Sequence, residues 1–469
     1  MLSVLMWALP LVVSGHLQVL TPPADDILRL TGTKGPYVDR LSQGLELDPP
    51  QGCSVEQVIM VMRHGARYPT ANAYPDLQGA LAKLENKTFS SGPLQFFNDW
   101  TPYVDNLGWL EQETFSGPYA GLLSAYQRGT EYRARYGHLW DGESIVPFWS
   151  SDSERVIMTA RHFGEGFFGY NYSTNAALNI VSEAESQGAN SLTPVCHAVD
   201  PKSGDVCSNL NVKQSYPLAS VAADRLNKRY GLNLTGDDVY NLQQLAVFEL
   251  NVRGDSPWLD AFTRDEWVAF NYYCGLDFFY CKGPGSAGSV AAGSVVANAS
   301  LSLLQQGPSE HAQAGGKMYW NFSHDSDIVP ILAALGLAYP DEKDVPYNGS
   351  IAFTAKYNAV DIMPMAGHVV FERLHCTEDT PAWSAGTYVR VILNEQVLPV
   401  QDCQNGPGFS CKLEDYIARA KKRLVDYNSF CKTPDDWQKH LSFWWNPNTT
   451  QQYNYQKGPI GYQQKTTLE

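Results

Sequence analysis

A short apolar run that leads directly into a cluster of basic residues constrains the fold of this chain more than any other feature. Residues 58–62 are five apolar residues, three of them β-branched, and form a run short enough for a strand buried on both faces. Residues 63–70 follow and read R-H-G-A-R-Y-P-T. Ligands of open α/β sheets bind at the carboxyl ends of strands, so the basic side chains are expected to face a pocket.

The residue types in this motif suit a phosphate group. Arginine donates paired hydrogen bonds from a planar fork and keeps its charge at any working pH, which favours Arg63 and Arg67 as phosphate ligands. Gly65 allows a tight turn or the close approach of a ligand. His64 lies between the two arginines and is a candidate nucleophile. The alternative is a salt-bridge cluster on the surface, which the residue types taken alone favour.

A second histidine follows another predicted strand, far along the chain. Residues 317–322 read as a strand, and His324 and Asp325 come directly after it. A helix ending at Gly336 is predicted from the apolar spacing of Ile328, Ile331, Leu332 and Leu335. If the two strands are neighbours in one sheet, His64 and His324 will share a pocket.

A further arginine occupies a similar position. Residues 145–149 read as a strand, and residues 150–153 supply side chains that cap helices. Arg155 is therefore expected near a strand end and a helix start, which is a good place for an anion. The alternative is a surface contact in which Arg155 pairs with Asp152 or Glu154.

The order R-H-G-x-R-x-P, with a His-Asp pair about 260 residues downstream, resembles the histidine acid phosphatases. These are the branch of the phosphoglycerate-mutase-like superfamily that includes the phytases and acid phosphatases of fungi and yeasts, and the resemblance extends from about residue 50 to residue 440. It implies that His64 attacks phosphorus and that Asp325 donates a proton to the leaving alcohol. It assigns the binding of phosphate to Arg63, Arg67, Arg155 and His324. No metal or other cofactor is implied.

The protonation of Asp325 is left open by the sequence. An acid must hold a proton, which favours a low working pH. Neighbouring arginines stabilise the carboxylate, whereas burial favours the acid form.

The same resemblance implies an α/β fold. A large α/β domain, with a central mixed, mostly parallel sheet flanked by helices, is expected at residues 53–187 and 317–469. A smaller, mostly α domain is expected as an insertion at residues 188–316, with helices near 218–230, 236–249 and 264–276. Residues 16–52, rich in proline pairs, read as an extended N-terminal arm.

Several features predict a secreted protein, extracellular or in the cell wall. Residues 1–15 hold an apolar run followed by Ser14 and Gly15, as in a signal peptide. Glycosylation sequons are predicted at Asn86, Asn171, Asn233, Asn298, Asn348 and Asn448. A seventh sequon, at Asn321, lies in the predicted strand 317–322 and should be inaccessible to glycosylation.

The chain has nine cysteines, with no C-x-x-C pair and no H-E-x-x-H motif, so disulfides are expected rather than a zinc site. The resemblance implies the pairs Cys53 with Cys376, Cys196 with Cys431, and Cys403 with Cys411. Cys274 and Cys281 then remain as a local pair, and Cys207 is left unpaired or intermolecular.

The net charge of −15 argues against nucleic acid and anionic membranes as partners. Binding a small phosphate ester is easier for such a chain at acid pH, where many carboxylates are protonated. A homo-oligomer is compatible with the sequence.

Substrate preference is read from two local features. Ala66 resembles the fungal phytases, whereas many yeast acid phosphatases have glutamate at this position. Residues 70–81 contain no lysine or arginine, although dedicated phytases often carry basic residues there for the remaining phosphates. Lys282, or other residues of the expected insertion, could supply that charge.

We therefore expect a phosphoric monoester hydrolase of the acid phosphatase or 3-phytase type, which forms a phosphohistidine and acts on phytate. The alternatives are an acid phosphatase of broad specificity with little preference for phytate, and a catalytically silent secreted glycoprotein that binds phosphate. A phosphoglycerate-mutase-type transferase is opposed by the signal peptide and by the pair His324 and Asp325. A glycosidase would need two carboxylates about 5 to 10 Å apart, which a sequence neither shows nor excludes.

Overall fold

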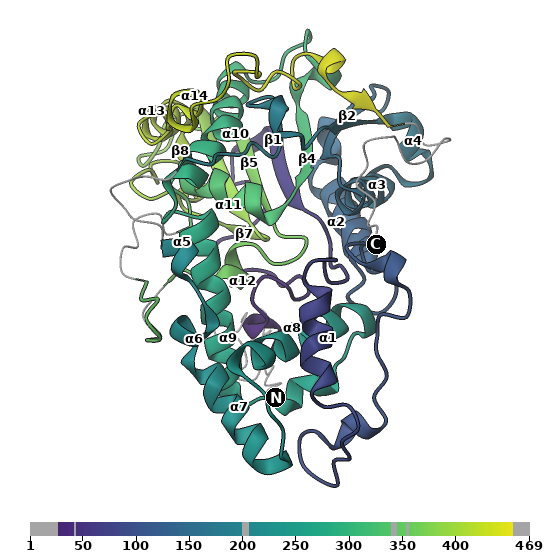
Figure 1. Ribbon diagram of the computed structural model, residues 1–469. Helices are drawn as coiled ribbons and strands as arrows, with labels where there is room; N and C mark the ends of the chain where they lie inside the picture. The colour runs from purple at the N-terminus through teal and green to yellow at the C-terminus, as the bar shows by residue number, and fades with distance from the viewer. Residues whose placement is uncertain (1–26, 42–43, 199–205, 339–344, 353–355, 454–469) are drawn as a thin grey trace, which may run out of the picture.

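The computed structural model describes residues 27–41, 44–198, 206–338, 345–352 and 356–453. The expected signal peptide and the first part of the expected N-terminal arm lie outside these residues. The described chain forms a large mixed sheet with helices on both faces, and a group of helices below it (Figure 1). The predicted α/β class, with a mixed sheet and flanking helices, is confirmed.

The sheet has nine strands in the order β7-β6-β5-β1-β4-β2-β3-β9, with β8 paired to β6. Its strands are β1 (Cys53–Arg63), β2 (Val146–Ser151), β3 (Ala176–Val181), β4 (Met318–Ser323), β5 (His368–Cys376), β6 (Gly386–Leu393), β7 (Gln396–Val397), β8 (Cys411–Lys412) and β9 (Gln451–Gln452).

The direction of the strands differs in part from the expectation. Strands β1, β4, β2 and β3 are parallel neighbours at the centre. Each of the other strands is added antiparallel to its neighbour, so the sheet is less parallel than expected. The reason is that β5, β6 and β7 follow one another directly and pair as hairpins, which reverse the chain, whereas parallel neighbours need long crossovers.

Residues 58–62, in the second half of β1, are continuously apolar because both faces of the strand are covered there. Side chains alternate between the faces of a strand, and both faces of β1 are covered. Ile59 and Val61 pack in the core formed with α10 and α11, whereas Val58, Met60 and Met62 pack in the core formed with α2 and α3. The strand is therefore fixed on both sides up to the residue where the basic motif begins.

The α-helices include four long ones that cover the sheet. Helices α2 (Gly121–Tyr136) and α3 (Glu154–Phe168) lie on one face, and α10 (Ala287–Gln306) and α11 (Asp325–Ala334) lie on the other (Figure 1). Helix α10 is long and apolar enough to cross a membrane by length and composition, but 72% of its apolar window is buried inside the molecule. Burial against α11, in the core that both helices share with β1, accounts for its apolar character.

The helices below the sheet share a second apolar core. Its members include the nine-residue α1 (Tyr74–Ala82) and the longer α7 (Pro217–Tyr230), α8 (Gly236–Arg253) and α9 (Arg264–Asp277). Capping boxes start α8 at Thr235 and α9 at Thr263, as expected for threonine followed three residues later by an acidic side chain. The helices predicted near residues 218–230, 236–249 and 264–276 are thus confirmed.

The remaining helices are short. They are α4 (Tyr172–Asn175), α5 (Val206–Asn209), α6 (Val212–Ser215), α12 (Ala359–Ile362), α13 (Leu413–Lys421), α14 (Tyr427–Cys431) and the π-helical turn η8 (Phe278–Lys282) that continues α9. The division of the chain into a domain and an insertion at residues 188–316 stays a prediction. Helix α10, although it belongs to that interval, packs against α11 beside the sheet.

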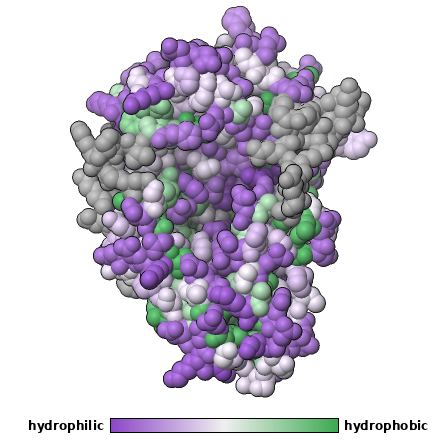
Figure 2. Space-filling view, viewed as in Figure 1, coloured by the Kyte–Doolittle hydropathy of each residue, from purple (hydrophilic) through white to green (hydrophobic). Residues whose placement is uncertain are grey.

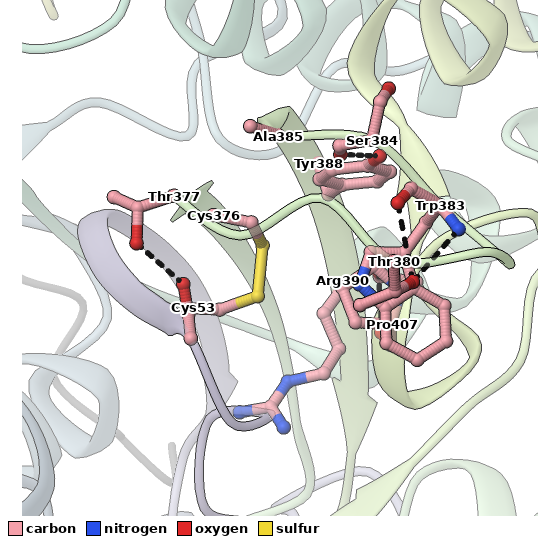
Figure 3. The surroundings of a disulfide bond; sticks show 12 residues. Cys53, Cys376, Thr377, Thr380, Trp383, Ser384, Ala385, Tyr388, Arg390 and Pro407 are labelled. Carbon is pink, nitrogen blue, oxygen red and sulfur yellow. Dashed lines mark hydrogen bonds between the residues drawn. A yellow bond between two sulfur atoms is a disulfide. The ribbon is translucent and has the colours of Figure 1, made fainter.

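Three of the expected disulfides are present and one expectation is wrong. Cys53 bonds to Cys376 and ties the start of β1 to the end of β5 (Figure 3). The other two confirmed pairs are Cys196 with Cys431 and Cys403 with Cys411.

The fourth disulfide joins Cys207 to Cys281, and Cys274 is a buried free thiol. Cys274 and Cys281 were expected to pair, but helix α9 runs on into η8 without a break between them. Seven helical residues span about 10 Å, beyond the reach of a disulfide.

Replacement of Cys207 with serine is expected to lower the free energy of unfolding by about 4 kcal/mol in the chain-entropy account. The bond closes a loop with a sequence separation of 74 residues, and its loss frees that loop in the unfolded chain. Chemical denaturation measures the change, and the Cys274→Ala variant is the matched control because it keeps all four bonds. A peptide map that joined Cys274 to Cys281 would contradict this pairing.

Candidate active site

The two histidine motifs meet because their strands are parallel neighbours. Arg63 at the end of β1 is in register with Ser323 at the end of β4, and the His64 N–H donates to the Ser323 carbonyl at 3.1 Å. The rings of His64 and His324 lie 5.6 Å apart between centroids, at an angle of 67°. Both are buried, with 2% and 8% of their surface exposed. The predicted shared pocket is thus present.

The His64 ring is held with one nitrogen free. Its Nδ1 lies 2.9 Å from the Gly65 carbonyl oxygen, which can only accept a hydrogen bond. Nδ1 therefore carries the proton and Nε2 carries the lone pair. Burial lowers the pKa of His64 well below its usual value, and Arg63, Arg155 and Arg67 lower it further. The imidazole is consequently neutral, and so nucleophilic, at acid pH.

Arg63 is fixed by backbone carbonyls and by Asp325. Its Nη1 donates to the carbonyls of Thr33 at 2.7 Å and Met363 at 2.8 Å. Its Nη2 lies 2.9 Å from Asp325 Oδ2. Both carbonyls belong to segments far from the motif in sequence, so a tertiary scaffold rather than the local chain orients this guanidinium.

The guanidinium groups of Arg67 and Arg155 each have a buried N–H group that donates to no other described residue. Arg67 Nη1 donates to the Tyr68 carbonyl at 2.8 Å, and the guanidinium lies 5.6 Å from the centroid of the Phe248 ring. The Nε atoms of both arginines are buried and have no hydrogen-bond partner among the described residues. Burial, followed by Arg155 and Arg63, lowers the pKa of Arg67 to about 9. Unused donors amid mutually repelling cations define a site for an anion.

Arg155 faces this site rather than the surface. It is the second residue of α3, and only 16% of its side chain is exposed. Its Nη1 lies 3.5 Å from Glu111 Oε2, and its Nη2 lies 3.5 Å from His324 Nδ1. The alternative pairing of Arg155 with Asp152 or Glu154 is absent from the ion pairs of the described residues.

His324 is oriented by Glu183, a residue for which the sequence predicted no role. His324 Nε2 lies 2.8 Å from Glu183 Oε1. Burial raises the pKa of Glu183, but the hydrogen bond and charge of His324 lower it more, to about 2. A carboxylate at Glu183 keeps the proton on Nε2 and turns Nδ1 towards Arg155. Glu183 follows the end of β3, so the strand-end argument that selected the histidines could also have selected it.

Asp325 is a carboxylate in the free site. Burial raises its pKa, but the charges of Arg63 and Lys282 lower it more, and the net pKa lies well below the usual value. The sequence left open whether burial or the arginines control the protonation of Asp325. In the site without substrate, the effect of Arg63 is the larger one and the carboxylate is favoured.

One face of the molecule is hollowed near the end of β1. Figure 2 shows a hollow in the middle of this face, lined mainly by hydrophilic residues, at the level where β1 gives way to the segment leading to α1. Among the described residues, no group of three or more histidine, cysteine, aspartate or glutamate side chains is placed to hold a metal ion. The expectation that no cofactor takes part stays a prediction.

Comparisons with known proteins agree with this geometry. Residues 54–394 match the family model of the histidine phosphatase superfamily, branch 2. The chain is 35% identical over 432 residues to the phytase PHO112 of Candida albicans, and 34% identical over 438 residues to the acid phosphatase PHO1 of Komagataella pastoris; each match covers 90% of both chains. The crystal structure of the phytase from D. castellii superimposes with a TM-score of 0.84 at 31% identity, over 97% of this chain and 98% of that one.

The chain therefore belongs to branch 2 of the histidine phosphatase superfamily. It is a phosphoric monoester hydrolase, related to the phytases and acid phosphatases of yeasts, and phosphate esters are its class of substrate.

Proposed function

We propose that the protein is a secreted acid phosphatase that forms a phosphohistidine on His64 and acts on phytate. The observation that carries this proposal is the His64 ring, whose Nδ1 is bonded to the Gly65 carbonyl so that Nε2 is free. Burial and the charges of three arginines lower its pKa, which favours the neutral ring. Relatives named as phytase and as acid phosphatase support both the reaction and the substrate.

The first displacement uses His64 as nucleophile. Nε2 forms a bond to phosphorus, the ester P–O bond breaks, and the leaving oxygen takes a proton from Asp325. The side chains of Arg63, Arg67 and Arg155 hold the phosphoryl oxygens and stabilise their charge in the transition state. His324 contributes a further hydrogen bond when the bound anion favours a second proton, on Nδ1. In the second displacement Asp325 accepts a proton from water, the water oxygen attacks phosphorus, and the P–N bond breaks to release phosphate and free His64.

Asp325 must gain its proton when substrate binds. In the free site Arg63 holds it as a carboxylate at 2.9 Å. An anionic phosphate beside the arginines offsets their charge and so raises the pKa of Asp325. Below about pH 6 a phosphomonoester also carries one proton of its own, which it can deliver to the site. This linkage accounts for catalysis at acid pH.

Phytate carries several phosphates, and Lys282 is placed to bind one that is not being cleaved. Lys282 lies in η8, which packs against α11, and its charge lowers the pKa of Asp325 in that helix. Lys282 Nζ lies 4.3 Å from the centroid of the Phe278 ring and 3.3 Å from Asp277 Oδ2. Its side chain is 28% exposed and therefore accessible to a ligand.

A second candidate is an acid phosphatase of broad specificity. Helix α1, which follows the motif directly, contains no lysine or arginine, and Asp277 already offsets part of the Lys282 charge. Release of phosphate from phytate and from p-nitrophenyl phosphate between about pH 3 and 7 distinguishes the two candidates. A protein that hydrolyses neither ester would be the silent phosphate-binding glycoprotein.

Replacement of Lys282 with alanine is expected to raise the KM for phytate about tenfold, because one charge-assisted contact to a remote phosphate is lost. The KM for p-nitrophenyl phosphate, which has a single phosphate, should change little. Steady-state kinetics at one acid pH measure both values, with Lys412→Ala, a lysine of β8, as the matched control. Equal changes for the two esters would remove the phytate role of Lys282.

The secreted location is supported by covalent and surface features. The four disulfides are of the kind that persist in oxidising compartments. The six asparagines predicted as glycosylation sites are all exposed. Asn321, which was expected to be inaccessible, is fully buried in β4 and hydrogen-bonded to the Met60 carbonyl and to Trp444.

A further inference from the structure

The segment at residues 111–114 is bonded to the catalytic motif along its length. The Tyr68 N–H donates to the Gln112 carbonyl at 3.0 Å, and the Thr114 N–H donates to the Ala66 carbonyl at 2.9 Å. Residue 113 thus forms an antiparallel bridge with residue 67. Because this bridge lies beside the turn that follows His64, the side chain at residue 113 can reach the backbone of that turn.

Glu113 makes that contact with a buried carboxyl group. Its side chain is 5% exposed, and Oε1 accepts a hydrogen bond from the Gly65 N–H at 2.5 Å. The same Oε1 lies 2.6 Å from the hydroxyl of Thr159 on α3. A Cβ at residue 65 would overlap the carboxyl, so glycine is required there to admit it. Oε2 is buried and has no hydrogen-bond partner among the described residues.

We propose that Glu113 is a positioning residue which, as an uncharged carboxylic acid, fixes the Gly65 amide and through it the direction of the His64 ring. The inference rests on the proposed role of His64 as the nucleophile. Gly65 is the link because its N–H is held by Glu113 while its carbonyl accepts from His64 Nδ1. One peptide unit therefore connects the carboxyl to the imidazole.

The hydrogen-bond pattern accommodates a proton on the carboxyl. The Thr159 hydroxyl has a single hydrogen and lies 2.9 Å from the Arg155 carbonyl, which can only accept. When the hydroxyl donates to that carbonyl, its 2.6 Å contact with Glu113 needs a hydrogen from the carboxyl. The hydroxyl and the carbonyl are then satisfied, and Oε1 is bonded to both Gly65 and Thr159, without a buried charge.

The charges around Glu113 are also consistent with the acid form. The segments bonded to Glu113 carry titratable groups that include Arg155 on α3, His64 and Arg67 in the motif, and Glu111 on its own segment. Burial raises the pKa of Glu113 to about 8, although the Thr159 and Gly65 hydrogen bonds and Arg155 lower it in part. A carboxylate here would offset the arginines that hold phosphate, which the neutral form avoids.

Three variants test the positioning role with p-nitrophenyl phosphate at about pH 5. Glu113→Ala is expected to lower kcat about 10²-fold, as small misplacements of a reacting group do, with little change in KM. Glu113→Gln keeps an acceptor for the Gly65 N–H without a charge and should retain most of the activity. Glu249→Gln, which replaces another buried carboxyl that bonds Trp100 and Ser256 instead of the motif, should leave kcat unchanged.

A readout independent of catalysis tests the proton on Glu113. Between its unfolded pKa near 4.5 and its folded pKa near 8, the native state holds one proton more than the unfolded state. The stability of the wild-type protein therefore falls, through this group, as the pH rises across that window. The Glu113→Gln variant has no titrating group at this position and so lacks this loss of stability. Its Tm should therefore rise relative to the wild-type Tm between about pH 5 and 8.

The outcomes separate this inference from the proposed function. Wild-type kcat in Glu113→Ala, or an equal loss of kcat in the Gln and Ala variants, would overturn the positioning role. A Tm difference between the Gln variant and wild type that stays constant with pH would overturn the neutral carboxyl, even if the Ala variant fails to fold. Neither result touches the role of His64, whose own test is a covalent phosphate on that residue.

Discussion

Replacing His64 with alanine is expected to lower kcat for p-nitrophenyl phosphate about 10⁶-fold, the scale of loss seen when a covalent nucleophile is removed from other enzymes. Among the described residues of the site, the arginines are cations, Asp325 is held by Arg63, and His324 is held between Glu183 and Arg155, so none of them is expected to replace the nucleophile. The KM should change much less than kcat, since the arginines that hold the phosphate remain. The variant therefore separates binding from chemistry.

Trapping the intermediate makes this test specific. Wild-type protein mixed with substrate and quenched in alkali should carry one phosphate on the peptide that contains His64, and the bond should be lost in acid. The matched control is His162→Ala, because His162 lies on α3 and bonds the Met158 carbonyl instead of the site. Turnover close to wild type in His64→Ala, or phosphate on another residue, would end the proposal.

The site residues that the sequence could predict are those that follow the carboxyl ends of strands. His64 and His324 each follow an apolar run, and parallel strands bring their carboxyl ends to one edge of a sheet. Arg155 follows the same rule through β2 and the start of α3. These residues could be selected because the periodicity of a buried strand is local and legible in a short stretch of sequence.

The residues that were missed depend on contacts between distant segments. Glu113 lies on an irregular segment with no periodic signal, and its role comes from the Gly65 amide 48 residues away. The pairing of Cys207 with Cys281 likewise depends on how the chain returns to η8, whereas the mistaken pair was chosen for nearness in sequence. Local sequence patterns carry no information on contacts between residues that are distant in sequence.

The charge state of Asp325 is a third kind of missing information. The sequence offered burial and arginine as opposing influences, and their balance depends on a distance. At 2.9 Å from Arg63 the carboxylate is favoured until substrate arrives. The fold therefore determines when the acid is available, which no motif could predict.

Asp325→Asn is accordingly expected to act unequally on different esters. For phytate and other alkyl phosphates, whose alkoxide is a poor leaving group, kcat should fall about 10³-fold, since general acid catalysis contributes on that scale. For p-nitrophenyl phosphate the leaving group needs no proton, and kcat should change little. The measurement is a series of esters of graded leaving-group pKa, in which the variant shows the steeper dependence of kcat.

A neighbouring carboxyl provides the control for this experiment. Asp327 lies two residues further along α11, accepts a hydrogen bond from the Ser323 hydroxyl at 3.0 Å, and has a pKa that burial and Glu183 raise well above the usual value. It is already uncharged at acid pH, so Asp327→Asn should leave the dependence on the leaving group unchanged. An equal loss for all esters in Asp325→Asn would mean that Asp325 serves to orient Arg63 through their 2.9 Å contact, and another group would have to protonate the alcohol.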